Sequence, residues 1–172
     1  ASPGTKQRAS AAITASGAAY VEGAVMAPVL RPGIGVPILA GGPLAADLAA
    51  RLNALGFAID PVAVEIGRAS SMKLCRSIII KGLEALMVDC ARACRAADVE
   101  AEVFASLAGS FPSIDWPELA DTMAERVATH GVRRSAEMVE AAAMLEEMGI
   151  HPGLAAAVAE AQLRGARPKP FA

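Results

Sequence analysis

The sequence predicts a mainly α-helical protein with a short α/β portion before it. Of the 172 residues, 54% are hydrophobic but only 3% are aromatic. Alanine makes up roughly a quarter of the chain, which is typical of closely packed helices. Strand-like apolar runs occur only before position 67, and beyond it apolar residues recur at helical spacings of three and four. We therefore expect two parts, residues 1–66 and 67–172.

In the first part, short apolar runs alternate with helical patterns. The leucines at positions 44, 48, 52 and 55 form one apolar helix face, and Gly56 follows it as a stop signal. Three strands and about two helices are too few to cover both faces of a sheet, so this layer is only partial. The expected elements are a weak helix over 5–15, strands over 18–26, 36–40 and 57–66, and a helix over 44–55.

The second part reads as helix only. Asp115 is placed as an N-cap and Pro117 in the first turn of its helix. The expected helices cover 70–97, 100–110, 116–130, 132–148 and 152–164, followed by a frayed tail over 166–172.

The first of these helices would be about 40 Å long. Ile78, Ile79 and Ile80 put apolar side chains on more than one of its faces, so we expect it to contact a second copy in a homodimer. The seam expected to face the core comprises Met72, Cys75, Ile79, Leu83, Leu86, Cys90 and Ala93.

Composition argues against several classes of partner. A net charge of −2 and a pI near 5.7 disfavour nucleic acid and anionic membrane surfaces. Charges interrupt every apolar run, and the opening residues lack the pattern of a signal peptide, so we expect a cytoplasmic protein. Cys75, Cys90 and Cys94 lack metal-ligand spacing and are expected to be core residues without a metal.

Few residues could carry chemistry, and they gather where the long helix starts. Lys73, Arg76 and Ser77 stand at i, i+3 and i+4, so they share one helix face just after a strand-to-helix switch. Two interpretations are open. The face is a solvated basic surface, or the Lys73 amine transfers protons.

Four segments in the right order resemble one enzyme family. Residues 69–77 (ASSMKLCRS) resemble the G-x-x-x-K-x-x-x-N helix start of the β-hydroxyacid dehydrogenases, which include 3-hydroxyisobutyrate and 6-phosphogluconate dehydrogenases. Residues 1–5 (ASPGT), 20–28 (YVEGAVMAP) and 36–42 (VPILAGG) resemble three upstream segments of that family. From Lys73 to about Gly165 the chain is similar to a phosphogluconate dehydrogenase-like subfamily with its own helical C-terminal domain.

The resemblance implies an NAD- or NADP-dependent oxidoreductase acting on a small hydroxy acid or alcohol. Residues 1–66 would be the last strands and helices of a Rossmann-type domain, and 67–172 an all-α substrate and dimerisation domain. The family's nucleotide fingerprint would lie upstream of Ala1, so the chain alone is expected to bind dinucleotide weakly. The implied residues are Lys73 as general acid/base, Met26, Ala27, Pro28, Arg76 and Ser77 at the substrate, and Ser2, Pro3 and Ser70 at the cofactor.

Three departures from the family pattern narrow the range of expected substrates. Residues 26–28 (MAP) replace a Ser-Gly-Gly, and Pro28 has no N–H to offer a carboxylate. Ser77 replaces an Asn, and it can still make one hydrogen bond. Ile80 stands where the sugar-phosphate branch has a Glu, which argues against decarboxylation of 6-phosphogluconate.

Two alternatives remain open. The chain could be a helical dimerisation module without chemistry of its own, since small residues let helices approach closely. It could also belong to an imine reductase-like enzyme, although the presence of Lys73 makes this the weaker enzymatic interpretation.

Overall fold

The computed structural model describes residues 1–166, and their fold is mainly α-helical, as predicted. It divides into two compact units. Unit 1 contains residues 1–76 and 143–151, and unit 2 contains residues 77–142 and 152–166. The two longest helices, α3 (Arg68–Ala97) and α5 (Trp116–Glu147), each contribute residues to both units.

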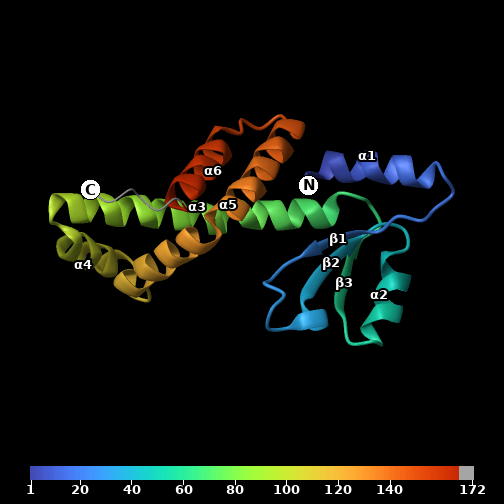
Figure 1. Ribbon diagram of the computed structural model, residues 1–172, viewed down its shortest axis with the longest axis horizontal. Coiled ribbons are helices and arrows are strands. Elements are labelled where there is room, and N and C mark those ends of the chain that lie inside the picture. Colours follow the sequence, from blue (N-terminus) through green and yellow to red (C-terminus); the bar gives the residue numbers. More distant parts are fainter. Residues whose placement is uncertain (167–172) are drawn as a thin grey trace. The chain divides into compact units, whose positions relative to one another are not determined.

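Unit 1 is built on a three-stranded sheet with the order β1 (Glu22–Val25), β2 (Pro37–Gly41), β3 (Ala58–Ala63) (Figure 1). The β1 strand is antiparallel to β2, with Glu22 opposite Gly41. The β2 strand is parallel to β3, with Pro37 opposite Ala58, because helix α2 (Ala45–Asn53) makes the crossover between them.

Small residues pack α2 onto the sheet. Ala40, Ala45, Ala49 and Ile59 form the buried cluster. Asn53 ties the end of the helix to β3, because its side-chain amide donates to the Ile59 carbonyl (2.9 Å) and accepts from the Ile59 N–H (2.8 Å). The remaining elements of unit 1 are α1 (Pro3–Thr14) and a 3-10 turn (Gly33–Gly35).

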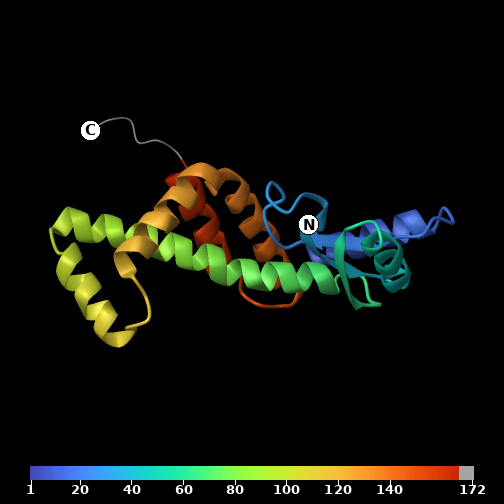
Figure 2. The ribbon, with the colours of Figure 1, turned by 90° about the horizontal axis from the view of Figure 1, so that it is seen from below.

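Unit 2 packs α3, α4 (Glu100–Ser110), α5 and α6 (Gly153–Gly165). The chain turns back after α3, and α4 lies beside the first turns of α5 (Figure 2). As predicted, Asp115 caps α5, since its Oδ1 accepts the Glu118 N–H (3.1 Å). The apolar core here consists of Met87, Ala91, Phe104, Trp116, Ala120 and Met123.

The expectation of separate helices over 116–130 and 132–148 is wrong, because α5 continues through Gly131. A Cβ at this glycine would collide with the Gln162 carbonyl oxygen and would lie 2.7 Å from the Ala166 Cβ. Gly131 therefore serves close packing of α6 against α5 and does not end a helix.

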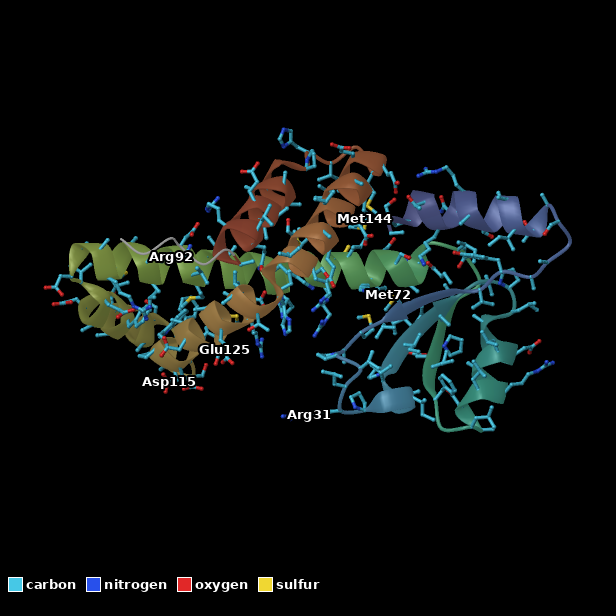
Figure 3. All side chains as sticks on the ribbon, viewed as in Figure 1. Arg31, Met72, Arg92, Asp115, Glu125 and Met144 are labelled. Atoms are coloured by element: carbon cyan, nitrogen blue, oxygen red, sulfur yellow. The ribbon has the colours of Figure 1, made fainter. Side chains whose placement is uncertain are left out.

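The predicted core seam of α3 is also wrong. Ile79 and Leu86 are each 69% exposed, and Cys75 is exposed as well. Met72, labelled in Figure 3, is 43% exposed. Of the three cysteines expected in the core, only Cys94 is buried.

A different face of α3 is buried, and it carries polar residues. Leu74, Ser77, Lys81, Glu84 and Met87 are all less than a tenth exposed. Residue spacing alone predicted that the more apolar face of α3 would be buried. It could not show that the charged residues on another face have buried partners.

No helix within residues 1–166 is both long and apolar enough to cross a membrane. The expected frayed tail lies almost entirely outside the residues that the structure describes.

Two glycines in helices should respond oppositely to alanine. Gly131→Ala should lower the free energy of unfolding by about 1–3 kcal/mol, because the added methyl group meets the α6 backbone. Gly109→Ala in α4 is the matched control, since no atom lies within 4 Å of the position that its Cβ would take, and it should be neutral or stabilise by up to about 1 kcal/mol. Urea unfolding measures both. Equal effects would contradict the packing role of Gly131.

Candidate functional site

The start of α3 is held by a buried carboxylate from β1. Glu22 is 1% exposed. Its Oε1 accepts the N–H groups of Gly67 (2.7 Å) and Ala69 (3.0 Å), and its Oε2 accepts the Ser70 hydroxyl (2.6 Å). The first N–H groups of a helix have no partner within the helix, and the helix dipole favours a negative charge there. Glu22 therefore caps α3 and joins it to the sheet.

Sequence reasoning missed Glu22, although a signal was present. It is the only charged residue between Ala18 and Leu30, inside an otherwise apolar run. Its charge also acts on a neighbour, because burial and the Glu22 carboxylate raise the pKa of Tyr20.

A second carboxylate holds the start of α1. Glu147, near the end of α5, accepts the Ser2 hydroxyl at Oε1 (2.7 Å) and the Gly4 N–H at Oε2 (2.9 Å). Ser2 itself caps α1 by accepting the Thr5 N–H (3.3 Å). The hydrogen bond from Ser2, then that from Gly4, and the nearby Arg8 charge lower the pKa of Glu147.

A cavity of about 660 Å³ lies within unit 1 at these two helix starts. Its wall comes from the start of α1, the end of β3 and the residues that follow it, the first turn of α3 and the end of α5. Gly67 allows the two helix starts to approach, since its φ is +106° and a Cβ there would lie 3.1 Å from the Pro3 Cβ. Arg68, Glu65 and Glu147 are the charged residues of this wall.

The structure brings the three residues implied for the cofactor to this end of unit 1. Pro3 lines the cavity. Ser2 and Ser70 are buried, and their hydroxyls already donate to Glu147 and Glu22. These serines are therefore engaged in holding the two helix starts.

Lys73 follows in the second turn of α3. Its side chain is half-buried, and it makes no hydrogen bond or ion pair within residues 1–166. Arg76, one turn further along, is exposed. In the segment implied for substrate, Met26 and Ala27 are half-buried and Pro28 is exposed. The Met26 N–H is engaged with the Pro37 carbonyl (2.9 Å).

Ser77 is 3% exposed and belongs to a polar group in unit 2. The Lys81 ammonium donates to Ser77 Oγ (3.0 Å) and lies 2.8 Å from Glu137 Oε2. Because Lys81 can only donate, the Ser77 oxygen is the acceptor, and its own hydrogen must point elsewhere. No acceptor for that hydrogen is found within residues 1–166.

A second buried ion pair lies beside this group. Glu84 is fully buried and pairs through both carboxylate oxygens with Arg134. Gln162 of α6 donates to Glu84 Oε2 (3.1 Å) and to the Lys81 carbonyl (3.1 Å). Removing one partner of such a pair leaves an uncompensated buried charge, so the pairs specify how α3, α5 and α6 align.

Residues 94–164 match the model of the DUF1932 family, described as a domain of unknown function. This match covers less than half of the chain. A solved conserved hypothetical protein from Sinorhizobium meliloti 1021 is 37% identical over 99% of this chain, with a TM-score of 0.88. The conserved protein MTH1747, whose structure is described as similar to 3-hydroxyacid dehydrogenases, is 30% identical over 96%, with a TM-score of 0.75. No curated protein matches the chain.

These findings confirm the resemblance to the hydroxyacid dehydrogenases. The chain spans 58% and 65% of the two solved structures. The roles of individual residues, the substrate and the cofactor stay predictions.

The Glu147 contact should make stability depend on pH. Since its pKa in the folded chain lies below the ordinary value of 4.5, the stabilisation is present above that pH and is lost as the pH falls through the folded value. Glu147→Gln should therefore be less stable than the wild type at about pH 6, with the difference shrinking toward about pH 3. Thermal midpoints across this range measure the effect.

Glu146→Gln is the matched control, because it removes an adjacent exposed carboxylate. It should leave the pH dependence of the wild type unchanged. A stability difference between Glu147→Gln and wild type that stays constant with pH would contradict the assignment.

Proposed function

We propose that the chain is part of an NAD- or NADP-dependent oxidoreductase that interconverts a small hydroxy acid or alcohol and its carbonyl product. One observation carries the proposal. On α3, the unpaired Lys73 precedes by one turn a buried Ser77 whose hydroxyl hydrogen has no acceptor within residues 1–166. This arrangement occurs in a chain similar to a protein described as resembling 3-hydroxyacid dehydrogenases.

Lys73 acts as the general acid/base. When the alcohol is oxidised, its amine takes the hydroxyl proton, and it returns that proton in the reverse reduction. The dinucleotide, when bound, accepts the hydride. Half-burial lowers the solvation of the amine, and no carboxylate within residues 1–166 pairs with it, so its nitrogen is available to a substrate.

Ser77 and Arg76 orient the substrate. Because Lys81 occupies the Ser77 oxygen as donor, the serine offers its hydrogen to a substrate oxygen. Arg76 is exposed on the same helix and can bind a carboxylate through two parallel hydrogen bonds. Pro28 has no backbone N–H, so residues 26–28 offer one hydrogen-bond donor fewer to a substrate. This favours a substrate that is bound mainly by residues of α3.

The proposed contact with the cofactor is supported differently for Pro3 than for Ser2 and Ser70. Pro3 lines the cavity at the starts of α1 and α3, so it would contact a small molecule bound there. The Ser2 and Ser70 hydroxyls fit a supporting role better than direct contact, since both donate to carboxylates of the chain.

Replacing Lys73 tests the proposal. In the longest natural polypeptide that contains this chain, Lys73→Met should reduce turnover of small hydroxy acids with NAD⁺ or NADP⁺ by about 10²–10⁴-fold, because a general base is lost. Dinucleotide affinity should stay within a few-fold of wild type. Arg92→Met, at an exposed position of α3, is the control. Near-normal turnover of the lysine variant would refute the role of Lys73.

The exposed α3 stripe favours a second function, dimerisation, which is compatible with the first. Met72, Ile79 and Leu86 recur every seven residues and are 43–69% exposed, which is unusual for large apolar side chains in one row. An imine reductase-like activity has no comparable support and remains the weaker alternative.

We expect a homodimer at micromolar concentration, with α3 at its contact. Leu86→Glu should shift sedimentation to the monomer, because it puts a charge into the apolar stripe. Leu30→Glu is the control, since Leu30 is 98% exposed on the loop after β1. A wild-type monomer at this concentration would contradict the dimer.

A further inference from the structure

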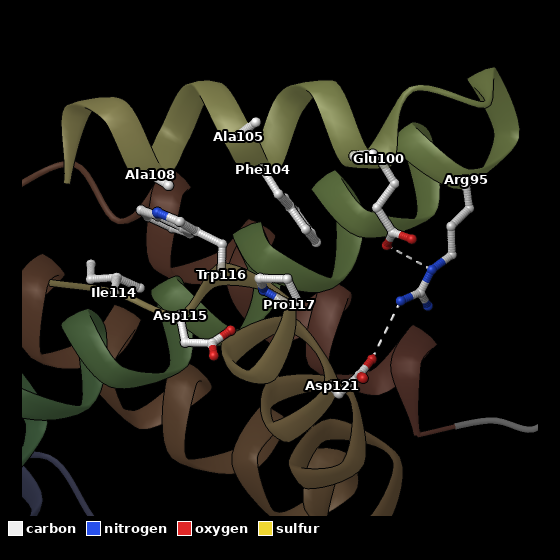
Figure 4. A pocket seen from close by; sticks show the side chains of 11 residues that line it. Arg95, Glu100, Phe104, Ala105, Ala108, Ile114, Asp115, Trp116, Pro117 and Asp121 are labelled. Carbon is white, nitrogen blue, oxygen red and sulfur yellow. Dashed lines mark hydrogen bonds and ion pairs between the residues drawn. The ribbon is translucent and has the colours of Figure 1, made fainter. Parts of the chain in front are cut away.

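A second cavity lies entirely within unit 2 and within the region that matches DUF1932. It has a volume of about 540 Å³ and lies between α4 and the first turns of α5, with Arg95 from the end of α3 at its edge (Figure 4). This volume is in the range of pockets that hold small organic molecules. None of the residues assigned to Lys73 chemistry lines it.

The inner wall of this cavity is apolar and aromatic. Phe104 and Trp116 are 6% and 9% exposed and belong to the core of unit 2, so their rings are fixed. Besides Glu100 and Phe104, α4 contributes only small side chains, Ala101, Ala105 and Ala108. Alanines at spacings of four and three lie along one helix face and leave room for a flat molecule beside the rings.

The rim is acidic. Glu100, Asp115 and Asp121 supply three carboxylates against the single guanidinium of Arg95. That guanidinium is already shared, with Nε 2.8 Å from Glu100 Oε1 and an Nη 3.3 Å from Asp121 Oδ1. The helix starts of α4 and α5 would by themselves favour an anion, but the surplus of two carboxylates reverses the sign.

The Trp116 indole N–H has no acceptor within residues 1–166 although the nitrogen is buried. Figure 4 shows this nitrogen on the edge of the ring turned toward Ala108. The apolar side chains packed around Trp116 offer no acceptor, so a molecule bound in the cavity can supply one. Buried indole N–H groups usually find a partner.

We propose that this cavity binds a small arylalkylamine, with its ring beside Trp116 and Phe104 and its alkylammonium group at the Asp115 and Asp121 carboxylates. Charge complementarity selects the amine, since an ammonium gains from the carboxylate surplus and can lie over an aromatic ring. The anion of a hydroxy acid would be repelled here. The site is therefore separate from the proposed oxidoreductase chemistry and does not depend on it.

Tyramine is the probe, because it combines an aromatic ring, an ammonium group and a phenolic oxygen that can accept the Trp116 N–H. Trp116 is the only tryptophan in the chain, so its fluorescence reports on this cavity alone. We expect saturable quenching or an emission shift when tyramine is titrated into the 172-residue chain, with excitation where phenols do not absorb. The carboxylate counterpart, 3-(4-hydroxyphenyl)propanoate, should produce no saturable change.

Two variants locate the site. Ala105→Leu fills the cavity from α4 and should weaken tyramine binding by about tenfold or more. Asp121→Asn removes one rim charge and should weaken it several-fold, with a smaller effect at high salt. Ala128→Leu makes the same change at an exposed position of α5 outside the cavity and should bind as wild type.

Three results of the tyramine titrations would overturn the proposal. They are the absence of saturable tyramine binding, equal binding of the amine and the acid, and undiminished binding by Ala105→Leu. The proposal would also be overturned if Trp116 emission changed with protein concentration and tyramine binding were lost at the same concentrations. A second copy of the chain would then fill the cavity.

Discussion

The capping of α3 by Glu22 is the interaction on which the arrangement of unit 1 depends. A carboxylate on β1 accepts two backbone N–H groups and one hydroxyl from residues 67–70, and it is almost completely buried. A buried carboxylate is tolerated only when such donors compensate its lost hydration. The same contact sets where α3 starts and therefore where Lys73 stands, one turn beyond Ser70. Glu22 on β1 thus contributes both to the stability of unit 1 and to the position of Lys73.

Helix α3 reverses the usual relation between polarity and burial. Its buried face contains Lys81 and Glu84, each matched by charged and polar groups from α5 and α6, whereas Ile79 and Leu86 are exposed. Ion pairs of this kind add little net stability compared with apolar packing, but they tolerate few alternative alignments. The helix can therefore hold Ser77 in a defined polar setting while its apolar stripe remains available for a second subunit.

Local signals in the sequence predicted most elements. The strand and helix order, the Asp115 cap and the start of α4 follow from alternation, capping residues and glycine stops. The wrong or missing predictions concern tertiary contacts. Gly131 was expected to separate two helices, because the sequence does not show that α6 packs closely against it. The wrong face of α3 was expected to be buried, because the charged partners of Lys81 and Glu84 on α5 lie more than 45 residues away. Glu22 was missed for the same reason, since its donors begin 45 residues downstream.

The two cavities differ in charge, and this difference separates their chemistry. In unit 1, Glu147 and Glu22 are satisfied by the donors of α1 and α3, so those carboxylates hold the helix starts together. In unit 2, the carboxylates around Trp116 outnumber the only guanidinium that lines the same cavity, and an indole N–H beside them has no acceptor within residues 1–166. The carboxylates of the second cavity have internal donors too, because Asp115 caps α5 and Arg95 pairs with Glu100 and Asp121. Their surplus of negative charge beside fixed aromatic rings is nevertheless complementary to a cationic ligand. Under our proposal, the region that matches DUF1932 has a recognition role of its own, distinct from the helix start that bears Lys73.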